Sequence, residues 1–290
     1  PHEVSRSPED FHALLCEQQV SVLNQTPSAF KQLMQSACET QATDKKLALR
    51  YVIFGGEALE IQSLRPWFEK FGDRSPQLIN MYGITETTVH VTYRPINLAD
   101  LSNDTTSPIG RPLRDLSWYL LDADLNPVAK GCIGELYVGG AGLARGYLNR
   151  TDLSATRFIA DPFSHDGARL YRTGDLARYR ADGVIEYIGR IDHQVKIRGF
   201  RIELGEIEAV LSSLEAVRQV VVLAQKGQSG QVQLVAYIVP SHTTTQDIMR
   251  ETLKVHLKEN LPDYMVPSHL LFLPQLPLTA NINHKSTMFG

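Results

Sequence analysis

The sequence predicts an α/β protein in which a doubly wound parallel sheet is joined to a β-rich subdomain and followed by a small α+β domain. Three regions with different patterns support this prediction. Helix and strand patterns alternate over residues 8–98, short strands and turns dominate residues 108–190, and a mixed pattern begins near residue 192. Alternating strands and helices are typical of a parallel sheet with covering helices. We therefore expect a large domain over residues 1–191, with the β-rich subdomain at about 108–190, and a small domain over residues 192–290.

The first region predicts three helices and three strands. Pro8 opens a helix whose positive end carries two acids, Glu9 and Asp10. Apolar residues at helical spacing and short apolar runs indicate the other elements. We expect helices over residues 8–18, 28–38 and 58–71, and strands over residues 20–23, 49–54 and 78–82. Ligands of such sheets bind at the carboxyl ends of the strands, where Asn24, Gly55 and residues 82–86 fall.

The two later regions predict antiparallel strands with fewer helices. In the β-rich subdomain we expect strands at residues 116–121 and 134–138 and a hairpin over residues 176–188. The small domain predicts a ribbon over residues 195–202, a helix over 205–214 and strands at 220–223 and 232–239. A last helix carries an apolar residue at every fourth position, namely Met249, Leu253, Leu257 and Leu261.

The composition is that of an ordinary globular protein. Of the 290 residues, 43% are hydrophobic and 21% are charged, and the net charge of −3 gives no electrostatic basis for binding nucleic acid or a membrane. No apolar run approaches the roughly 18 residues that a transmembrane helix needs. Cys16, Cys38 and Cys132 are odd in number and widely spaced, which excludes a disulfide framework or a Cys-x-x-Cys metal site and favours the cytoplasm. We expect all three to be small buried hydrophobic residues.

The most informative motif is Thr173-Gly174-Asp175, followed about fifteen residues later by Arg190, Asp192 and Lys196. The motif places a carboxylate on a glycine-bearing turn. A carboxylate can accept hydrogen bonds from the vicinal hydroxyls of a ribose, and an arginine suits the phosphate of the same nucleotide. The spacing alone supports a nucleotide site and an ordinary capped turn beside a basic strand about equally.

Five ordered motifs extend this observation along nearly the whole chain. They are residues 80–88 (NMYGITETT), 134–147 (GELYVGGAGLARGY), 171–176 (YRTGDL), 189–199 (GRIDHQVKIRG) and 199–208 (GFRIELGEIE). Their order and spacing resemble those of the adenylate-forming enzyme superfamily, and specifically the adenylation domains of nonribosomal peptide synthetases. The resemblance implies that ATP activates an amino acid as an aminoacyl-adenylate. A phosphopantetheine thiol on a peptidyl carrier domain then takes the aminoacyl group. A neighbouring condensation domain is also expected.

The resemblance implies a role for each matching residue. Tyr82 would present its ring to adenine, Thr85 would bind a phosphate oxygen, and Glu86 would provide a carboxylate ligand for Mg²⁺. Asp175 would bind the ribose hydroxyls, and Arg190 would lie near the ribose or phosphate. Thr85, Glu86 and Arg190 form the expected catalytic set. In the motif of residues 189–199, Asp192 would be the hinge about which the small domain turns. Lys196 would serve the same hinge region, and the alternative is that it is an ordinary exposed lysine on a strand.

Six positions match the side-chain pocket of the family, and they are Asn24, Ile53, Gly55, Met81, Val89 and His90. Three of them would form an apolar wall, glycine would leave room, and the asparagine and histidine would offer polar groups. A small side chain with a hydroxyl and a methyl suits both halves of this pocket, and the set resembles the threonine-selecting pattern. We therefore expect L-threonine in preference to valine and serine. The alternative is that Asn24 and His90 bond only to backbone in the sheet.

Two family features are missing from the sequence. No glycine-rich phosphate loop is present, and the expected Gly-Lys pair is absent after Leu276-Pro277-Leu278-Thr279-Ala280-Asn281. Lys285 corresponds better to a downstream lysine, so we do not assign it a catalytic role. The chain lacks an initial Met, and we expect a carboxyl-terminal fragment with a truncated sheet domain. One alternative is an acyl- or aryl-CoA ligase, and another, which we favour for the isolated chain, is a non-catalytic polypeptide that keeps the fold.

Overall fold

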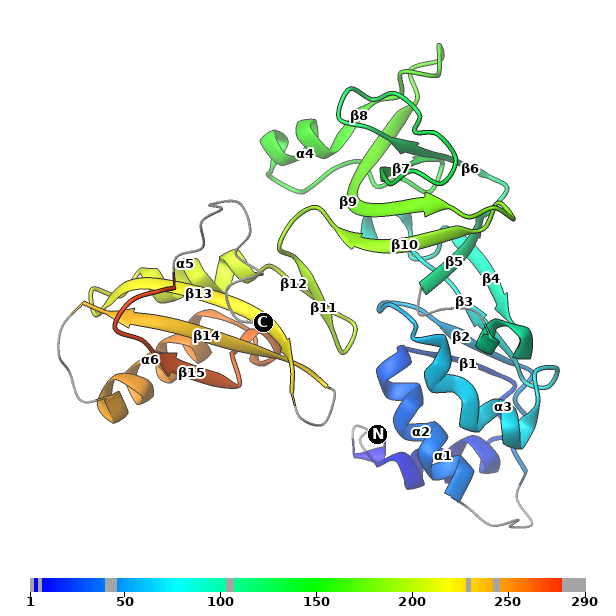
Figure 1. Cartoon of the computed structure of the whole chain (residues 1–290), viewed down its shortest axis with the longest axis horizontal. Coiled ribbons are helices and arrows are strands. Elements are labelled where there is room, and N and C mark those ends of the chain that lie inside the picture. Colours follow the sequence, from blue (N-terminus) through cyan, green and yellow to red (C-terminus); the bar gives the residue numbers. More distant parts are fainter. Residues whose placement is uncertain are drawn as a thin grey trace. The chain divides into compact units, whose positions relative to one another are not determined.

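The computed structural model describes residues 3–4, 7–39, 46–102, 107–227, 231–241 and 246–277, and it divides the chain into two compact units, Pro1–Asp192 and His193–Gly290. The large unit is built on one sheet of ten strands (Figure 1). Nine strands follow one another across the sheet in the order β1 (Val22–Gln25), β2 (Tyr51–Phe54), β3 (Gln77–Asn80), β4 (Thr92–Ile96), β5 (Ser107–Pro112), β10 (Ile185–Arg190), β9 (Arg169–Tyr179), β7 (Gly134–Gly140) and β6 (Leu116–Leu121). The tenth, β8 (Phe158–Ala160), pairs with β9.

The direction of pairing changes once along this sheet. Strands β1 to β3 are parallel, as the alternation of helices and strands predicts. From β4 onward every neighbouring pair is antiparallel. The expected β-rich part is therefore a continuation of the α/β sheet, joined to it by hydrogen bonds. The mixed α/β fold with a large sheet and a small second unit confirms the predicted fold class.

Helices cover the parallel strands. These are α1 (Pro8–Glu17), α2 (Pro27–Glu39) and α3 (Arg65–Phe71), and α4 (Thr151–Arg157) lies later in the chain. Short 3₁₀ turns span Ile61–Leu64, Thr85–Thr87 and Leu98–Ser102. The expected helix over residues 58–71 is wrong in its first half, because the α-helix begins only at Arg65. Pro66 has no N–H to donate and its ring would clash with the preceding turn, so it fits only in the first turn of a helix.

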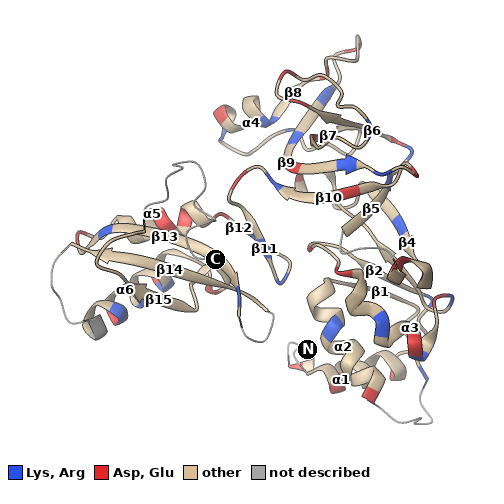
Figure 2. Ribbon diagram, in the orientation of Figure 1, with Lys and Arg blue, Asp and Glu red and all other residues tan. Residues whose placement is uncertain are grey.

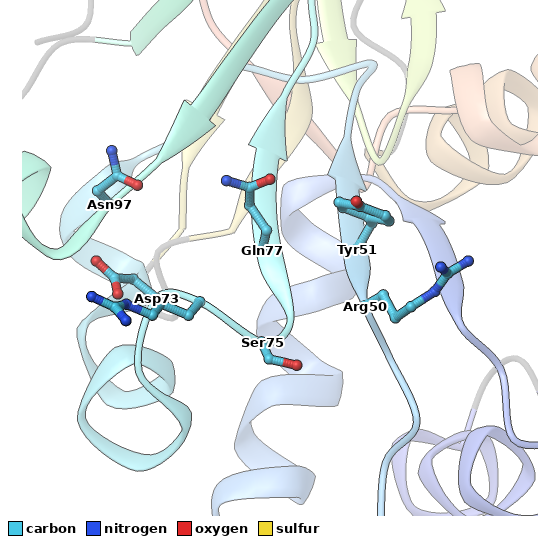
Figure 3. Close-up of a pocket in the computed structure, with 7 residues that line it drawn as sticks. Arg50, Tyr51, Asp73, Ser75, Gln77 and Asn97 are labelled. Atoms are coloured by element: carbon cyan, nitrogen blue, oxygen red, sulfur yellow. The ribbon is translucent and has the colours of Figure 1, made fainter.

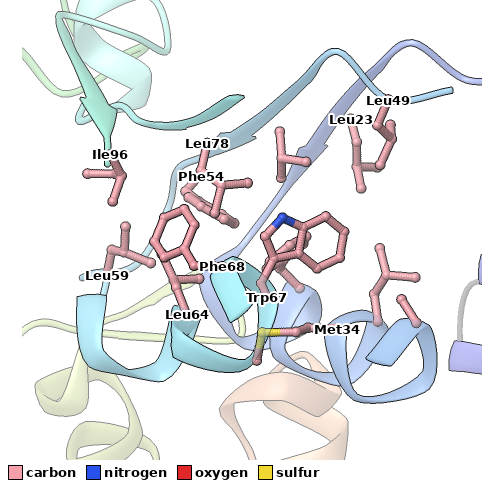
Figure 4. Packing of buried hydrophobic residues seen from close by; sticks show 14 of the residues in the cluster. Leu23, Met34, Leu49, Phe54, Leu59, Leu64, Trp67, Phe68, Leu78 and Ile96 are labelled. Carbon is pink, nitrogen blue, oxygen red and sulfur yellow. The ribbon is translucent and has the colours of Figure 1, made fainter. Parts of the chain in front are cut away.

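A single apolar core joins the helices to the sheet. Trp67 of α3 is fully buried, and its ring centroid lies 4.8 Å from that of Phe30 on α2, which in turn lies 5.0 Å from Phe54 of β2. Figure 4 shows Trp67 and Phe68 facing Phe54 and Leu78 of the sheet. Truncating such a buried aromatic residue to alanine costs about 3–5 kcal/mol, so this core fixes the strands whose ends carry the predicted site.

The small unit has its own sheet and core. Strands β11 (Val195–Ile197) and β12 (Phe200–Ile202) form a ribbon, and a sheet follows in the order β13 (Val217–Lys226), β14 (Val232–Pro240) and β15 (His269–Phe272). Strand β15 runs parallel to β14, which the expectation of antiparallel strands missed. The helices are α5 (Leu204–Ser212) and α6 (Gln246–Asn260), with a 3₁₀ turn at Asp263–Met265. The repeated apolar positions Met249, Leu253, Leu257 and Leu261 are all buried in this core.

The cysteines and charges complete the description. All three cysteines are free thiols, but only Cys16 is buried, Cys38 is half-buried and Cys132 is exposed, so the prediction of buried cysteines holds for Cys16 alone. Cys132 lies in a turn that follows Lys130 and Gly131, where no apolar surface covers it. Lys and Arg are interspersed with Asp and Glu over the described parts of both units, in keeping with the small net charge (Figure 2).

Candidate nucleotide site

The site is organised by a bulge in β9. Glu135 of β7 pairs with Leu176 and Tyr137 pairs with Arg172, so the single residue Leu136 faces the three residues Thr173, Gly174 and Asp175. Gly174 has φ +75°, a conformation that favours glycine. The Thr173 Oγ1 donates to Leu136 O at 2.8 Å and accepts from Asp175 N at 3.0 Å. The bulge therefore interrupts the regular pairing of β7 with β9. The two bonds of Thr173 hold the backbone at Asp175 and so fix the direction of its side chain.

Both carboxylate oxygens of Asp175 have protein partners. The residue is fully buried, Oδ1 accepts from Arg190 Nη1 at 2.9 Å, and Oδ2 accepts a short hydrogen bond from the Tyr82 hydroxyl. Arg190 lies opposite Asp175 in the β9–β10 pairing. The structure thus brings together three of the predicted nucleotide residues, although their positions in the sequence span more than a hundred residues.

Tyr82 follows β3 and lies in the core beside the site. Its ring packs edge-on against Trp118 at a centroid distance of 6.1 Å and lies 6.4 Å from Tyr187. Burial, reinforced by the neighbouring Asp175 carboxylate, holds the pKa of the Tyr82 phenol well above its ordinary value. The hydroxyl therefore stays protonated and donates to Asp175 at neutral pH. The expected adenine contact of the Tyr82 ring remains a prediction.

The end of the large unit is tied to the same bulge. Arg190 donates from Nε and Nη2 to the two oxygens of Asp192, at 2.6 and 2.7 Å, and Ile191 N donates to Gly174 O at 2.9 Å. Arg157, the last residue of α4, approaches Asp192 Oδ2 at 3.6 Å. A Cβ built on Gly174 would lie 2.9 Å from Arg190 Nη2, 3.2 Å from Arg157 Nη1 and 3.2 Å from Asp192 Oδ2. Two arginines and the predicted hinge residue therefore converge over one glycine.

Glu86 lies in a cluster of hydroxyl groups next to β9. Its carboxylate is buried, and Oε1 accepts from the Tyr147 hydroxyl at 2.6 Å and from the Tyr171 hydroxyl at 2.9 Å. Burial and the Glu86 hydrogen bond raise the pKa of Tyr147 far above its ordinary value. The neighbouring Thr85 is exposed, so its hydroxyl is accessible to a ligand. The resemblance gave no role to Tyr147 or Tyr171, although Tyr147 lies within one of the quoted motifs and Tyr171 begins another.

Three of the expected pocket residues are neighbours in the structure. A Cβ on Gly55 would lie 3.1 Å from His90 Cε1 and 3.7 Å from Met81 O. His90 Nδ1 is buried and has no hydrogen-bond partner among the described residues, and burial lowers the pKa of this imidazole. Two others, Asn24 and Ile53, are paired across β1 and β2.

Val89 completes the expected pocket set and is 61% exposed, with φ +70°. The backbone at this position therefore turns sharply between the 3₁₀ turn of Thr85–Thr87 and His90. A β-branched residue rarely adopts a positive φ, so this turn is held by its surroundings. Val89 N donates to Ile84 O at 3.2 Å, and Val91 N donates to Tyr82 O at 2.8 Å.

Lys196 and the carboxyl-terminal segment that lacks Gly-Lys belong to the second compact unit, His193–Gly290. Lys196 is on β11 of the small unit, opposite Arg201. The segment in which Gly-Lys is missing continues through Asn281 to Lys285 and lies outside the described residues. Within the described ranges, no cluster of three or more His, Cys, Asp or Glu side chains could hold a metal ion.

One polar pocket lies away from these residues. Its volume is about 400 Å³, and it is lined by Arg50, Tyr51, Asp73, Arg74, Ser75, Gln77 and Asn97. Figure 3 shows these side chains around the first residues of β2 and β3. The expected pocket residues Gly55 and Met81 follow the opposite, carboxyl ends of the same two strands, and none of the predicted site residues lines this polar pocket.

None of the helices in the described part of the chain offers an apolar stretch long enough to cross a bilayer.

Comparison with known proteins identifies the family of the chain. A family model described as "AMP-binding enzyme" matches residues 1–148, and one described as "AMP-binding enzyme C-terminal domain" matches residues 206–282. The chain is 53% identical over 281 residues to a dimodular nonribosomal peptide synthase of Bacillus subtilis (strain 168). The aligned region covers 97% of this chain and 12% of that protein.

Two solved structures have the same fold. The holo form of PA1221, an NRPS protein containing adenylation and PCP domains, superposes with a TM-score of 0.79 at 28% identity, over 94% of this chain and 45% of that one. The Vibrio cholerae adenylation domain AlmE in complex with glycyl-adenosine-5'-phosphate gives a TM-score of 0.76 at 28% identity, over 92% of this chain and 49% of that one. The chain thus spans less than half the length of these relatives. It belongs to the AMP-binding enzyme family of adenylate-forming ligases, and its sequence is similar to those of nonribosomal peptide synthetase adenylation domains.

Proposed function

We propose that the chain forms part of an amino-acid adenylation domain that activates L-threonine and passes it to a carrier domain. The substrate carboxylate attacks the α-phosphorus of ATP and releases pyrophosphate. The thiol of a phosphopantetheine arm then attacks the carbonyl of the aminoacyl-adenylate and releases AMP. The observation that carries this proposal is the convergence of Tyr82, Asp175 and Arg190 on one bulge. Support also comes from the glycyl-adenosine-5'-phosphate bound to AlmE and from the adenylation and PCP domains of PA1221.

Asp175 and Arg190 supply the proposed nucleotide contacts. The carboxylate accepts hydrogen bonds from the ribose hydroxyls, and each such charge-assisted bond contributes about 1.5–3 kcal/mol. Because Oδ1 and Oδ2 already accept from Arg190 and Tyr82, their direction is fixed before the nucleotide binds, and a carboxylate oxygen can accept a second bond. Arg190 lies near the ribose or phosphate, and its charge is held in place by Asp175 and Asp192.

Glu86 is the proposed ligand for Mg²⁺, and its surroundings fit that role. Mg²⁺ prefers one or two carboxylates and takes its other ligands from substrate phosphates and water. The buried Glu86 carboxylate is oriented by the hydroxyls of Tyr147 and Tyr171, and the neighbouring Thr85 hydroxyl is accessible to a phosphate oxygen. The metal supplies charge neutralisation for the phosphates when it is bound. Asp192 and Lys196 are the proposed hinge residues between the two half-reactions.

The preference for threonine rests on Gly55, Met81 and His90. The absence of a side chain at Gly55 leaves room beside the imidazole of His90, and the buried Nδ1 of that ring can bond to a substrate hydroxyl. A substrate hydroxyl that pairs with this nitrogen would gain about 1–3 kcal/mol over a purely aliphatic substrate, which leaves the nitrogen unpaired. The methyl of threonine fits the apolar wall of Ile53, Met81 and Val89, and Asn24 offers a second polar group. A neighbouring condensation domain would receive the product.

The proposal is tested by loading of the carrier. The intact module that carries these residues, with its carrier domain, is mixed with ATP, Mg²⁺ and equal amounts of the amino acids, and the phosphopantetheine arm is analysed by mass spectrometry. We expect a threonyl thioester on the phosphopantetheine arm and no loading of a carrier domain that lacks this arm. A valyl thioester would contradict the substrate assignment. In a parallel mixture that contains coenzyme A and carboxylic acids in place of the carrier and the amino acids, formation of an acyl- or aryl-CoA would favour an acyl- or aryl-CoA ligase. Repeating the assay with the 290-residue chain tests whether that chain alone is non-catalytic.

A further inference from the structure

Glu135 is a buried carboxylate that lies beside the bulge but has no part in the reaction described above. It belongs to β7, and its side chain is 7% exposed. Its Oε1 accepts from the backbone N of Gly174 at 3.1 Å and from Arg172 Nε at 3.0 Å. The other oxygen, Oε2, accepts from Arg172 Nε at 3.0 Å and from the Tyr137 hydroxyl at 3.3 Å. Glu135 therefore holds the residue that immediately precedes Asp175.

The bulge creates the need for this acceptor. Three residues of β9 face one residue of β7, so the backbone groups of these three residues that point toward β7 lack the usual ladder partners. A buried N–H without a partner is strongly unfavourable, and Glu135 accepts the Gly174 N–H, while Thr173 Oγ1 accepts the Asp175 N–H. Arg172 fixes the carboxylate by contacting both of its oxygens. A short side chain at position 135 could not reach across the strand gap to Gly174.

We propose that Glu135 is a positioning residue for nucleotide binding, which acts through Gly174 to hold Asp175 in the orientation that receives the ribose. This proposal rests on the proposed function only for the ribose contact, because the hold on the bulge is a separate property. Without Glu135, the Gly174 N–H loses its acceptor and the bulge relaxes toward other backbone conformations. Asp175 then presents its oxygens to the nucleotide for a smaller fraction of the time.

The chain offers a close control for this role. Glu186 of β10 is also a buried carboxylate, 3% exposed, and it is paired with a half-exposed arginine, Arg178, from the neighbouring strand β9. The corresponding exposures of Arg172 and Glu135 are 46% and 7%, and those of Arg178 and Glu186 are 42% and 3%. Glu186 accepts from Arg178 Nε, eight residues away along the hairpin, and this bond lies outside the bulge of residues 173–175. Both substitutions disrupt a buried ion pair, but only one removes the Gly174 acceptor.

The hold on the bulge is tested by amide hydrogen exchange in the 290-residue chain, without nucleotide. In Glu135→Ala we expect exchange at Gly174 to accelerate at least about tenfold relative to the wild type. In Glu186→Ala the rate at Gly174 should stay within about threefold. Glu135→Gln keeps an acceptor oxygen, so it should protect Gly174 more than alanine does and provides a readout if the alanine variant folds poorly. Equal exchange at Gly174 in the Glu135 and Glu186 variants would overturn the proposal.

The effect on the nucleotide is tested by pyrophosphate exchange in the intact module that carries these residues. We expect Glu135→Ala to raise the KM for ATP at least about fivefold, with a smaller change in kcat, and to reduce the preference for ATP over 2′-deoxy-ATP. Adding Glu135→Ala to Asp175→Asn should cause little further loss, because both changes act on one contact. Independent, multiplicative losses would overturn the proposal. If Gly174 exchange responds but Asp175→Asn leaves ATP binding unchanged, the ribose assignment fails while the hold on the bulge stands.

Discussion

Arg190 donates to Asp175 across the β9–β10 pairing at 2.9 Å, and the two side chains are 6% and 0% exposed. Removing one partner of such a buried pair leaves an uncompensated charge and typically costs about 3–5 kcal/mol. The pair is also joined to Tyr82 on one side and to Asp192 on the other. The proposed ribose carboxylate and the end of the large unit are therefore parts of one charged network, which suggests that nucleotide binding and hinge position are coupled.

Asp175 is the residue whose replacement tests the ribose contact. Asp175→Asn keeps the shape and one acceptor oxygen but removes the charge, and we expect the KM for ATP in the intact module to rise at least about tenfold. Asp161→Asn is the control, since Asp161 is also buried and its Oδ1 accepts only a local bond from Phe163 N at 2.8 Å. Unchanged ATP dependence in a folded Asp175→Asn variant, shown by circular dichroism, would remove the proposed role.

Arg157 provides a second cation for Asp192 and had no assigned role. Its pair with Asp192 is 3.6 Å long and partly exposed, so Arg157→Gln should change the hinge equilibrium by about 1 kcal/mol or less. We expect the ratio of thioester formation to adenylation to change by about twofold to fivefold. Arg150→Gln is the control, because Arg150 immediately precedes the same helix, α4, and its ion pair among the described residues is with the exposed Asp152. Equal changes in both half-reactions would show that Arg157 does not influence the hinge.

Asp192 lies at the boundary between the two compact units. Asp192→Pro would fix φ at this position and remove the carboxylate that Arg190 holds. We expect one half-reaction, either adenylation or thioester formation, to fall far more than the other, because each needs its own domain orientation. The measurement compares single-turnover rates of the two steps in the intact module. If both rates fell by the same factor, the hinge would lie elsewhere.

His90 gives a prediction about pH. Burial lowers its pKa in the folded state from 6.5, so below pH 6.5 the unfolded chain binds more protons than the folded chain. Its contribution to stability is therefore fully present above 6.5 and is lost as the pH falls toward the folded pKa. We expect the melting temperature of the wild type to drop more steeply between pH 7 and about 5.5 than that of His90→Gln. The exposed His165 provides the control, His165→Gln, and parallel curves for wild type and His90→Gln would contradict the prediction.

The sequence was informative about residues that belong to local patterns. Gly55 directly follows β2, as the apolar run over residues 49–54 predicts, and the buried face of α6 follows from a repeat of four. The predicted strand over residues 20–23 is displaced by two residues from β1, so Asn24 lies inside that strand and not after it. These patterns depend on side-chain periodicity, which is a property of neighbouring residues. The predicted boundary near Asp192 rests on the same kind of signal, a change of pattern along the chain.

Contacts between distant residues were not predictable in this way. The approach of Arg157 to Asp192 joins a helix end to a strand end 35 positions away, and nothing in the spacing of either segment indicates it. Glu135 lay within a recognised motif, but its role depends on a bulge whose register is set by pairing of β7 with β9. The continuation of the parallel sheet into antiparallel strands was missed for the same reason, because strand order is a tertiary property.

The central claim is that this site belongs to an enzyme that activates amino acids with ATP. The most direct test is ATP–pyrophosphate exchange by the intact module that carries these residues, measured with single amino acids and with none. We predict exchange that depends on the added amino acid, is highest with L-threonine, and is at least about tenfold weaker with valine, which lacks the hydroxyl. Exchange that no amino acid stimulates, in a folded module that binds ATP, would contradict the account.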